Sequence, residues 1–308
     1  MSHHDQQNDH RDHHHSLAED IETMLNMTAS RRQSLRWLFA SAAIPIAGCG
    51  GGSDSSTASA ATTTSTTSTT STSTTSGTTS TTSSGTVTAS DGSTCAVIPE
   101  ETGGPYPGDG TNSNTSGVAN ALIMAGIVRS DIRASINGAT GVAQGTPLTI
   151  KLKLVNVKSS CATLAGATVY LWHCDRDGRY SMYSSGITAE NYLRGVQEAD
   201  SSGIVTFQTI FPGCYDGRMP HVHFEVYPTL ASATSASNRI KTSQFGFPNA
   251  TLTEAYTATG YGTSVTNLAR ISYATDNVFS DGTTLQIVSV TGNVTQGYVA
   301  TLTVGVSV

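Results

Sequence analysis

The chain has 308 residues, of which only 12% are charged, and 16 Lys and Arg against 22 Asp and Glu give a formal net charge of -6. This length can hold two domains, but the first ninety or so residues are poor material for a hydrophobic core, so we expect one. The absence of a basic stripe in the sequence argues against a nucleic-acid partner.

Residues 1–29 are predicted to be a disordered, histidine-rich leader. The segment is polar, shows no apolar period and holds six of the nine histidines of the chain. We interpret these histidines as part of a low-complexity tract and not as a metal site. They are His3, His4, His10, His13, His14 and His15.

Residues 30–49 have the layout of an export signal. Arg31 and Arg32 precede an apolar run, residues 37–47, which is too short to span a bilayer. The arginine pair resembles a twin-arginine signal, although Ser34 stands where that signal usually has Phe. A short N-terminal helix is the alternative.

The export signal ends in Ile-Ala-Gly-Cys at residues 46–49, which resembles a lipoprotein processing site with Cys49 as the acylated residue. We therefore expect an exported protein, in the periplasm, on the cell surface or secreted, with a membrane tether if Cys49 is lipidated. Residues 50–91 are almost all Ser, Thr, Gly and Ala and are predicted to form a flexible linker.

Residues 92–308 are predicted to form one mainly β domain, a two-sheet β-sandwich. Short runs rich in Val, Ile, Thr and Tyr alternate with Gly, Asp, Asn and Pro clusters, and helical periodicity is scarce, with one short helix expected near Val265–Ala269. Seven strands suffice for such a core. They are expected at Pro147–Val155, Ala167–Trp172, Ile204–Thr209, Val222–Tyr227, Thr242–Phe245, Leu285–Val290 and Tyr298–Val306.

Two acidic segments between expected strands, residues 175–178 and 200–203, resemble calcium loops but are explained more simply as turns. The four cysteines of this domain can form two disulfides in an oxidising compartment, in any of three connectivities. These cysteines are Cys95, Cys161, Cys174 and Cys214.

His221 and His223 are the first candidate metal ligands in the sequence. In a strand their side chains face the same way, with about 6.5 to 7 Å between their Cα atoms, so they can chelate one metal ion. Two strand histidines can equally be hydrogen-bonded at a sheet surface, so this pair alone leaves the metal open.

Two tyrosines and an arginine strengthen the metal interpretation. Tyr215 lies in a Pro- and Gly-rich segment that can fold back over the histidines, and Tyr180 follows the turn after Trp172. Arg218 is a cation three residues from His221, and its charge would be costly beside a metal unless an anionic ligand or substrate offsets it. Phenolates are hard anionic donors that suit a trivalent cation, so two Tyr and two His favour Fe(III) over Zn(II) or Fe(II).

The segments ATVYLWHCDRDGRYSMY (residues 167–183) and NYLRGVQEADSSGIVTFQTIFPGCYDGRMPHVHFEVYP (residues 191–228) resemble the core of the intradiol ring-cleavage dioxygenases, the family of catechol and protocatechuate dioxygenases. The resemblance begins near residues 100–106 and continues weakly to the C-terminus. The chain is similar to the compact secreted members, because it lacks the helical N-terminal dimerisation segment of the catechol enzymes. Its oligomeric state stays open.

The resemblance implies that Tyr180, Tyr215, His221 and His223 bind Fe(III), with Arg218 and Gln244 as further active-site residues. It implies a catechol-type substrate and O2, with Tyr215 leaving the metal as the substrate binds while Tyr180 stays. Arg218 would stabilise negative charge on the ring, and Gln244 would position Arg218 or the substrate.

One departure from the family concerns Cys214, which stands where secreted members usually carry Trp, so the substrate preference is open. Cys214 is a candidate to pair with Cys174.

Two alternative functions are disfavoured. A carboxylate site made of His221, His223 and Glu225 is disfavoured because three in-line positions span about 13 Å. A lipid-anchored β-sandwich that binds aromatic ligands without metal requires the four motif matches to be accidental.

Overall fold

A computed structural model describes residues 86–89, 92 and 94–308 of the chain. The expected leader, the export signal with Cys49 and nearly all of the linker lie outside these residues. Among the residues described, no helix has both the length and the apolar character needed to cross a membrane.

Four antiparallel strands form the sheet that carries the histidine pair, in the order β11-β10-β7-β8. The central strand β10 places His223 opposite Gln244 of β11 on one side and opposite Trp172 of β7 on the other. The strands are β7 (Thr168–Trp172), β8 (Arg194–Glu198), β10 (His221–Tyr227) and β11 (Lys241–Gly246).

The second sheet is built around β5 (Pro147–Asn156), one of its two ten-residue strands. β5 pairs in parallel with β13 and antiparallel with β9, while β12 and β6 extend the sheet. The bounds are β6 (Ala162–Thr163), β9 (Ile204–Ile210), β12 (Ser289–Asn293) and β13 (Gly297–Val306).

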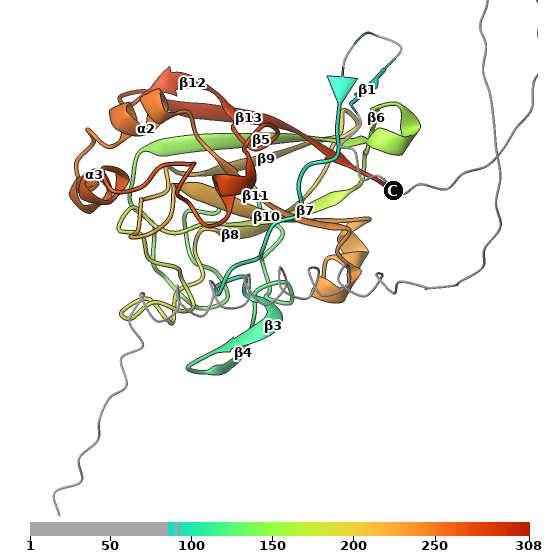
Figure 1. The fold of residues 1–308 in the computed structure, drawn as a ribbon. Helices are drawn as coiled ribbons and strands as arrows, with labels where there is room; N and C mark the ends of the chain where they lie inside the picture. Colours follow the sequence, from blue (N-terminus) through green and yellow to red (C-terminus); the bar gives the residue numbers. More distant parts are fainter. Residues whose placement is uncertain (1–85, 90–91, 93) are drawn as a thin grey trace, which may run out of the picture. The chain divides into compact units, whose positions relative to one another are not determined.

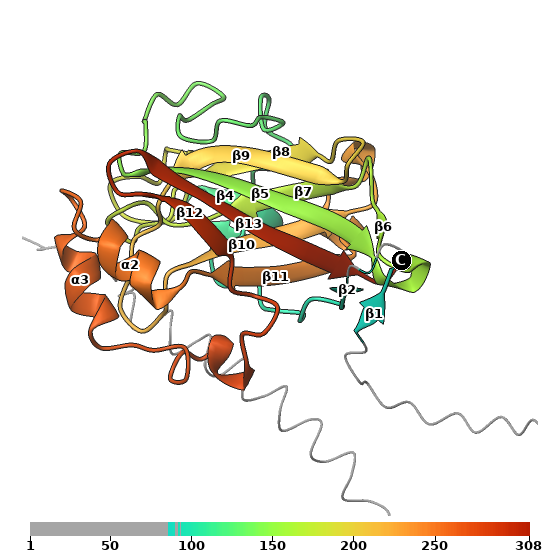
Figure 2. The same cartoon turned by 90° about the horizontal axis from the view of Figure 1, so that it is seen from above.

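The two sheets stack face to face as two layers (Figures 1 and 2). Strand β5 shows why: Leu148, Ile150, Leu152 and Leu154 are buried, and they alternate with more exposed Thr and Lys residues. From the facing sheet, β10 contributes Val222, Phe224 and Val226 to the same core. The predicted two-sheet β-sandwich is therefore confirmed.

The remaining elements are short. Helices α2 (Asn249–Ala255) and α3 (Gly262–Leu268) lie together beyond one end of the strands (Figure 1). The hairpins are β1 (Val87–Thr88) with β2 (Thr94–Cys95), and β3 (Asp109–Asn114) with β4 (Gly117–Asn120). Short 3-10 helices are η1 (Val157–Ser159), η2 (Leu230–Ser232), η3 (Ala236–Asn238) and η4 (Phe279–Asp281).

Each of the seven expected strand regions falls on or next to an observed strand, but the sequence prediction placed one strand too early and missed α2, β8 and the short strands β1 to β4 and β6. The strand expected at Leu285–Val290 starts only at Ser289, because buried Gln286 hydrogen-bonds to Glu101 and to the Gln244 backbone. Helix α2 was not expected; its seven residues bury only Leu252 and Ala255, too few to show a period. Strand β8 was missed because buried Arg194 interrupts its apolar pattern.

Only one of the two expected disulfides is present among the described residues, and it joins Cys95 to Cys161. The suggested pair Cys174 and Cys214 is wrong: both are buried free thiols. Their sulfur atoms contact backbone carbonyl oxygens instead, Cys174 that of Gly213 and Cys214 that of Arg218, each at 3.5 Å.

Candidate metal centre

Strand β10 presents His221 and His223 on the face of its sheet that points away from the sandwich core. All seven residues of β10 are buried, although alternate side chains leave opposite faces. The odd-numbered side chains are buried because a second apolar cluster covers this outer face, and it includes Leu122, Ile127 and Tyr180. The histidines thus lie beneath a layer of loops and not at an exposed sheet surface.

Tyr180 reaches the histidines through the turn that follows β7. Asp175 closes this turn by accepting hydrogen bonds from the backbone N–H groups of Asp177 and Arg179, so its predicted role as a turn residue is confirmed. Gly178 has a φ of 82°, and a Cβ there would lie 2.8 Å from the Cβ of Tyr215. Only glycine lets the two tyrosine-bearing segments approach this closely.

Tyr215 is brought in by the Pro- and Gly-rich loop before β10, and helix α3 holds that loop. Ser264 accepts a hydrogen bond from the backbone N–H of Cys214, and Asn267 donates one to its carbonyl oxygen. The predicted helix near residues 265–269 is therefore present, and it fixes the backbone beside Tyr215.

The donor atoms of three predicted ligands lie around Nε2 of His221, the donor atom of the fourth. The Nε2 atom of His221 lies 3.0 Å from Nε2 of His223 and 3.4 Å from the phenol oxygens of Tyr180 and Tyr215. Donors that share an ion at about 2.1 Å are about 3.0 Å apart at a right angle and about 3.4 Å apart at a tetrahedral angle. The arrangement therefore fits a single metal ion.

Protonation of His221 also fits metal binding. Its Nδ1 lies 2.6 Å from the Met219 carbonyl oxygen, which can only accept, so Nδ1 carries the proton and the lone pair of Nε2 faces the tyrosines. Burial, reinforced by nearby positive charge, lowers the pKa of both histidines well below the ordinary value, so both rings are neutral. The ring of His223 stacks on Trp172 with centroids 5.0 Å apart, which fixes its plane.

The two phenols are costly to ionise without a cation. Burial raises the pKa of Tyr180 well above its ordinary value and that of Tyr215 to about 12. A metal ion among the four donors would reverse this by stabilising the phenolates. Tyr106 packs on Tyr180 with ring centroids 5.1 Å apart and closes the site from the loop side.

Arg218 and Gln244, the other two predicted site residues, contact each other. Arg218 is 1% exposed and donates from Nη2 to Oε1 of Gln244 at 2.7 Å. Gln244 donates in turn to the Thr102 carbonyl oxygen. These contacts agree with a role of Gln244 in positioning Arg218, while a direct contact of Gln244 with the substrate stays a prediction.

Glu225 lies on the same face of β10 but turns to other partners. It accepts a hydrogen bond of 2.6 Å from Tyr227 and lies 3.6 Å from Arg239. Among the described residues no group of three or more His, Cys, Asp or Glu side chains is placed to hold a metal ion. The carboxylate site considered from sequence is therefore not supported, whereas two phenol oxygens lie 3.4 Å from Nε2 of His221.

Sequence reasoning missed the carboxylate of Asp276, which forms an ion pair with Arg218 at 2.9 Å. From the sequence, an anionic ligand or substrate was expected to offset Arg218 and not a carboxylate of the chain, and 58 residues separate Asp276 from Arg218.

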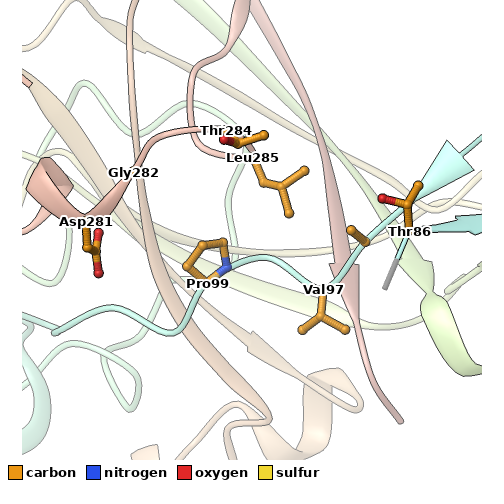
Figure 3. Close-up of a pocket in the computed structure, with 8 residues that line it drawn as sticks. Thr86, Val97, Pro99, Asp281, Gly282, Thr284 and Leu285 are labelled. Carbon is orange, nitrogen blue, oxygen red and sulfur yellow. The ribbon is translucent and has the colours of Figure 1, made fainter. Parts of the chain in front are cut away.

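A surface pocket of about 340 Å³ between residues 96–99 and 281–285 holds none of the predicted site residues (Figure 3).

Comparisons with known proteins agree with this architecture. Residues 128–252 match a family model described as dioxygenase. The intradiol ring-cleavage dioxygenase from Tetranychus urticae is 24% identical, with a TM-score of 0.53 over 69% of this chain and 95% of that one. The dioxygenase Tetur07g02040 has the same identity and coverage and a TM-score of 0.50. The search of curated proteins finds no match.

Residues 128–252 match a dioxygenase family, and the fold of the chain is a β-sandwich like that of the intradiol ring-cleavage dioxygenase compared above. Both findings agree with the resemblance seen in the sequence.

Proposed function

We propose that the chain is an Fe(III)-dependent enzyme that opens the ring of catechol-type aromatics between the two hydroxylated carbons, with O2 as co-substrate, to give muconate-type dicarboxylates. One observation carries this proposal. Nε2 of the neutral His221 ring lies 3.0 Å from Nε2 of His223 and 3.4 Å from each of the phenol oxygens of Tyr180 and Tyr215.

The donor set favours trivalent iron over other metals. Phenolate oxygens are hard anions, and two of them with two imidazoles offset most of a charge of +3 in a buried site. A divalent ion would supply less of the stabilisation needed to ionise Tyr180 and Tyr215, whose pKa values burial raises. When bound, iron would act as a Lewis acid toward both hydroxyl groups of a catechol.

The protein side chains supply proton transfer and charge stabilisation. Tyr215, as a phenolate, is placed to accept a proton from a catechol hydroxyl group, in keeping with the role implied by the family. Arg218 offers an N–H group at Nη1 that has no partner in the described protein. A buried donor of this kind stabilises negative charge that develops on the ring.

A metal-free module that binds aromatic ligands is not favoured. Such a module does not require Nε2 of His221 to lie within 3.4 Å of three other donor atoms. Buried imidazoles and phenols arranged in this way are costly unless a cation organises them.

The proposed location is outside the cytoplasm, with export through the twin-arginine-type signal at residues 30–49 and lipidation at Cys49. The Cys95–Cys161 disulfide supports this proposal, because disulfides persist mainly in oxidising compartments. Mass analysis of membrane-extracted protein tests it: acylated Cys49 at the mature N-terminus is the expected result.

The decisive experiment on function is an iron assay and a visible spectrum of the purified protein, before and after catechol is added without oxygen. We expect about one iron per chain and a tyrosinate-to-iron band that shifts with catechol, followed by a dicarboxylate product when oxygen is admitted. A protein that stays colourless after reconstitution with iron would refute the proposal.

A further inference from the structure

The guanidinium group of Arg218 is held on three sides in a fully buried position. Its Nε donates to Oδ2 of Asp276 at 2.9 Å and its Nη2 to Gln244 at 2.7 Å. The ring of Phe279 lies 5.9 Å from its Cζ atom and covers one face. Among the residues that the structure describes, Nη1 alone of the three nitrogen atoms finds no hydrogen-bond partner.

Asp276 itself is 0% exposed and uses both carboxylate oxygens fully. Oδ2 accepts from Arg218 and, at 2.7 Å, from the backbone N–H of Met219. Oδ1 accepts from the backbone N–H groups of Val278 and Phe279 at 2.8 and 3.0 Å. Four hydrogen-bond donors fix this carboxylate, so it holds the Arg218 side chain and the Met219 backbone in defined positions.

The same carboxylate connects Arg218 to a predicted metal ligand. The Met219 peptide donates its N–H to Asp276, and the Met219 carbonyl oxygen accepts the Nδ1 proton of His221. Asp276 also holds the backbone of Phe279, whose ring packs against both Arg218 and His221. One acidic residue therefore sets the position of the cation and supports the orientation of the imidazole.

We infer that Asp276 is a positioning residue of the intradiol reaction: it fixes the Arg218 guanidinium so that Nη1 is free for the substrate, and it offsets the cation next to the metal. The inference rests on the proposed function. A buried guanidinium beside a trivalent ion is unfavourable without a nearby anion, and Asp276 is the carboxylate that forms an ion pair with Arg218.

The direct test is Asp276→Asn in the full chain. The amide oxygen can still accept from Val278 and Phe279, but the amide nitrogen then faces two donors, Arg218 Nε and the Met219 N–H. We expect iron content to stay at the wild-type level while kcat/KM for catechol falls about 100-fold. Asp281→Asn is the matched control, since it removes an exposed carboxylate five residues along the chain, and it should leave both values unchanged.

A double-mutant cycle with Arg218→Ala separates positioning from a merely structural role. If Asp276 acts through Arg218, Asp276→Asn should cost less than about threefold in kcat/KM once Arg218 is absent. The affinity for catechol without oxygen, read from the visible band, should show the same loss of effect. Independent, multiplicative effects of the two substitutions would overturn the inference.

The remaining outcomes also decide between alternatives. If Asp276→Asn does not fold, Asp276→Glu keeps the charge but displaces the carboxylate, and wild-type kcat/KM in that variant would overturn the inference. Wild-type protein that binds iron but never opens a catechol ring would refute the proposed function instead. The thermal unfolding midpoints of the cycle would then still report whether Asp276 and Arg218 are coupled.

Discussion

His221 donates the Nδ1 proton to the carbonyl oxygen of Met219 at 2.6 Å, and this contact leaves the lone pair of Nε2 for a metal. The contact is local, because Met219 stands only two residues before His221 in the chain. The residues at the start of β10 therefore orient the His221 ring by a local contact. Alternation along the strand places His223 on the same face.

Loss of His223 is expected to weaken metal binding strongly, whereas loss of Glu225 is not. His223→Ala removes one of four donors and should lower iron affinity by more than about 100-fold. Glu225→Gln is the matched control on the same face of β10, and it should keep full iron content in a metal assay. Parallel loss of iron in both variants would instead support a carboxylate-containing site.

The visible spectrum of the iron-loaded protein should distinguish Tyr180, a predicted metal ligand, from its neighbour Tyr183. Tyr180→Phe removes only the phenol oxygen that lies 3.4 Å from His221, so the tyrosinate-to-iron band should lose intensity and shift. Tyr183→Phe removes a phenol that hydrogen-bonds to Asn112 instead, and the band should not change. An unaltered band in Tyr180→Phe would remove Tyr180 from the ligand set.

Arg218→Ala is expected to keep iron and colour but to lose most turnover. Removing one donor that stabilises developing charge costs about 100- to 1000-fold in kcat. Arg133→Ala, which removes a surface arginine paired with Asp131, serves as the control. Steady-state kinetics at equal iron content measure the effect, and unchanged turnover in Arg218→Ala would contradict the role assigned to it.

Features set by local sequence could be predicted, and those set by distant contacts could not. Alternation in β5 and β10 predicts the sandwich and the shared face of His221 and His223, and the turn at Asp175 predicts the return of the chain near Tyr180. The four ligands together were named through the resemblance to a family. Asp276 could not be found, because its partner Arg218 lies on a different segment and only the fold brings them together.

Cysteine pairing also depends on distant contacts that the local sequence does not show. Sequence allowed three pairings, and the suggested pair of Cys174 and Cys214 is wrong because backbone carbonyl oxygens, and not each other, contact their sulfur atoms. No local pattern reports which way a buried thiol points.

The Cys95–Cys161 disulfide is expected to stabilise the domain substantially. It closes a loop with a sequence separation of 66 residues, and constraints of this kind typically contribute about 2 to 4 kcal/mol to the free energy of unfolding. Replacing both cysteines by serine should lower the free energy of unfolding by that amount, measured by urea unfolding. Cys214→Ser is a single-thiol control, and an equal loss there would show that thiol removal alone is destabilising.

Stability should fall between about pH 4.5 and pH 7 through the side chain of Glu101. Burial raises the pKa of Glu101 from its ordinary value of 4.5 to about 7, although a hydrogen bond from Gln286 opposes this. In that interval the folded protein holds a proton that the unfolded chain has released, so rising pH favours unfolding until the folded group also ionises. Glu101→Gln keeps an oxygen for Gln286 but cannot ionise. Thermal midpoints measured from pH 4 to pH 8 should therefore fall less in the variant than in the wild type, with the two most alike at pH 4. Parallel curves across the whole range would show that Glu101 does not carry the proton.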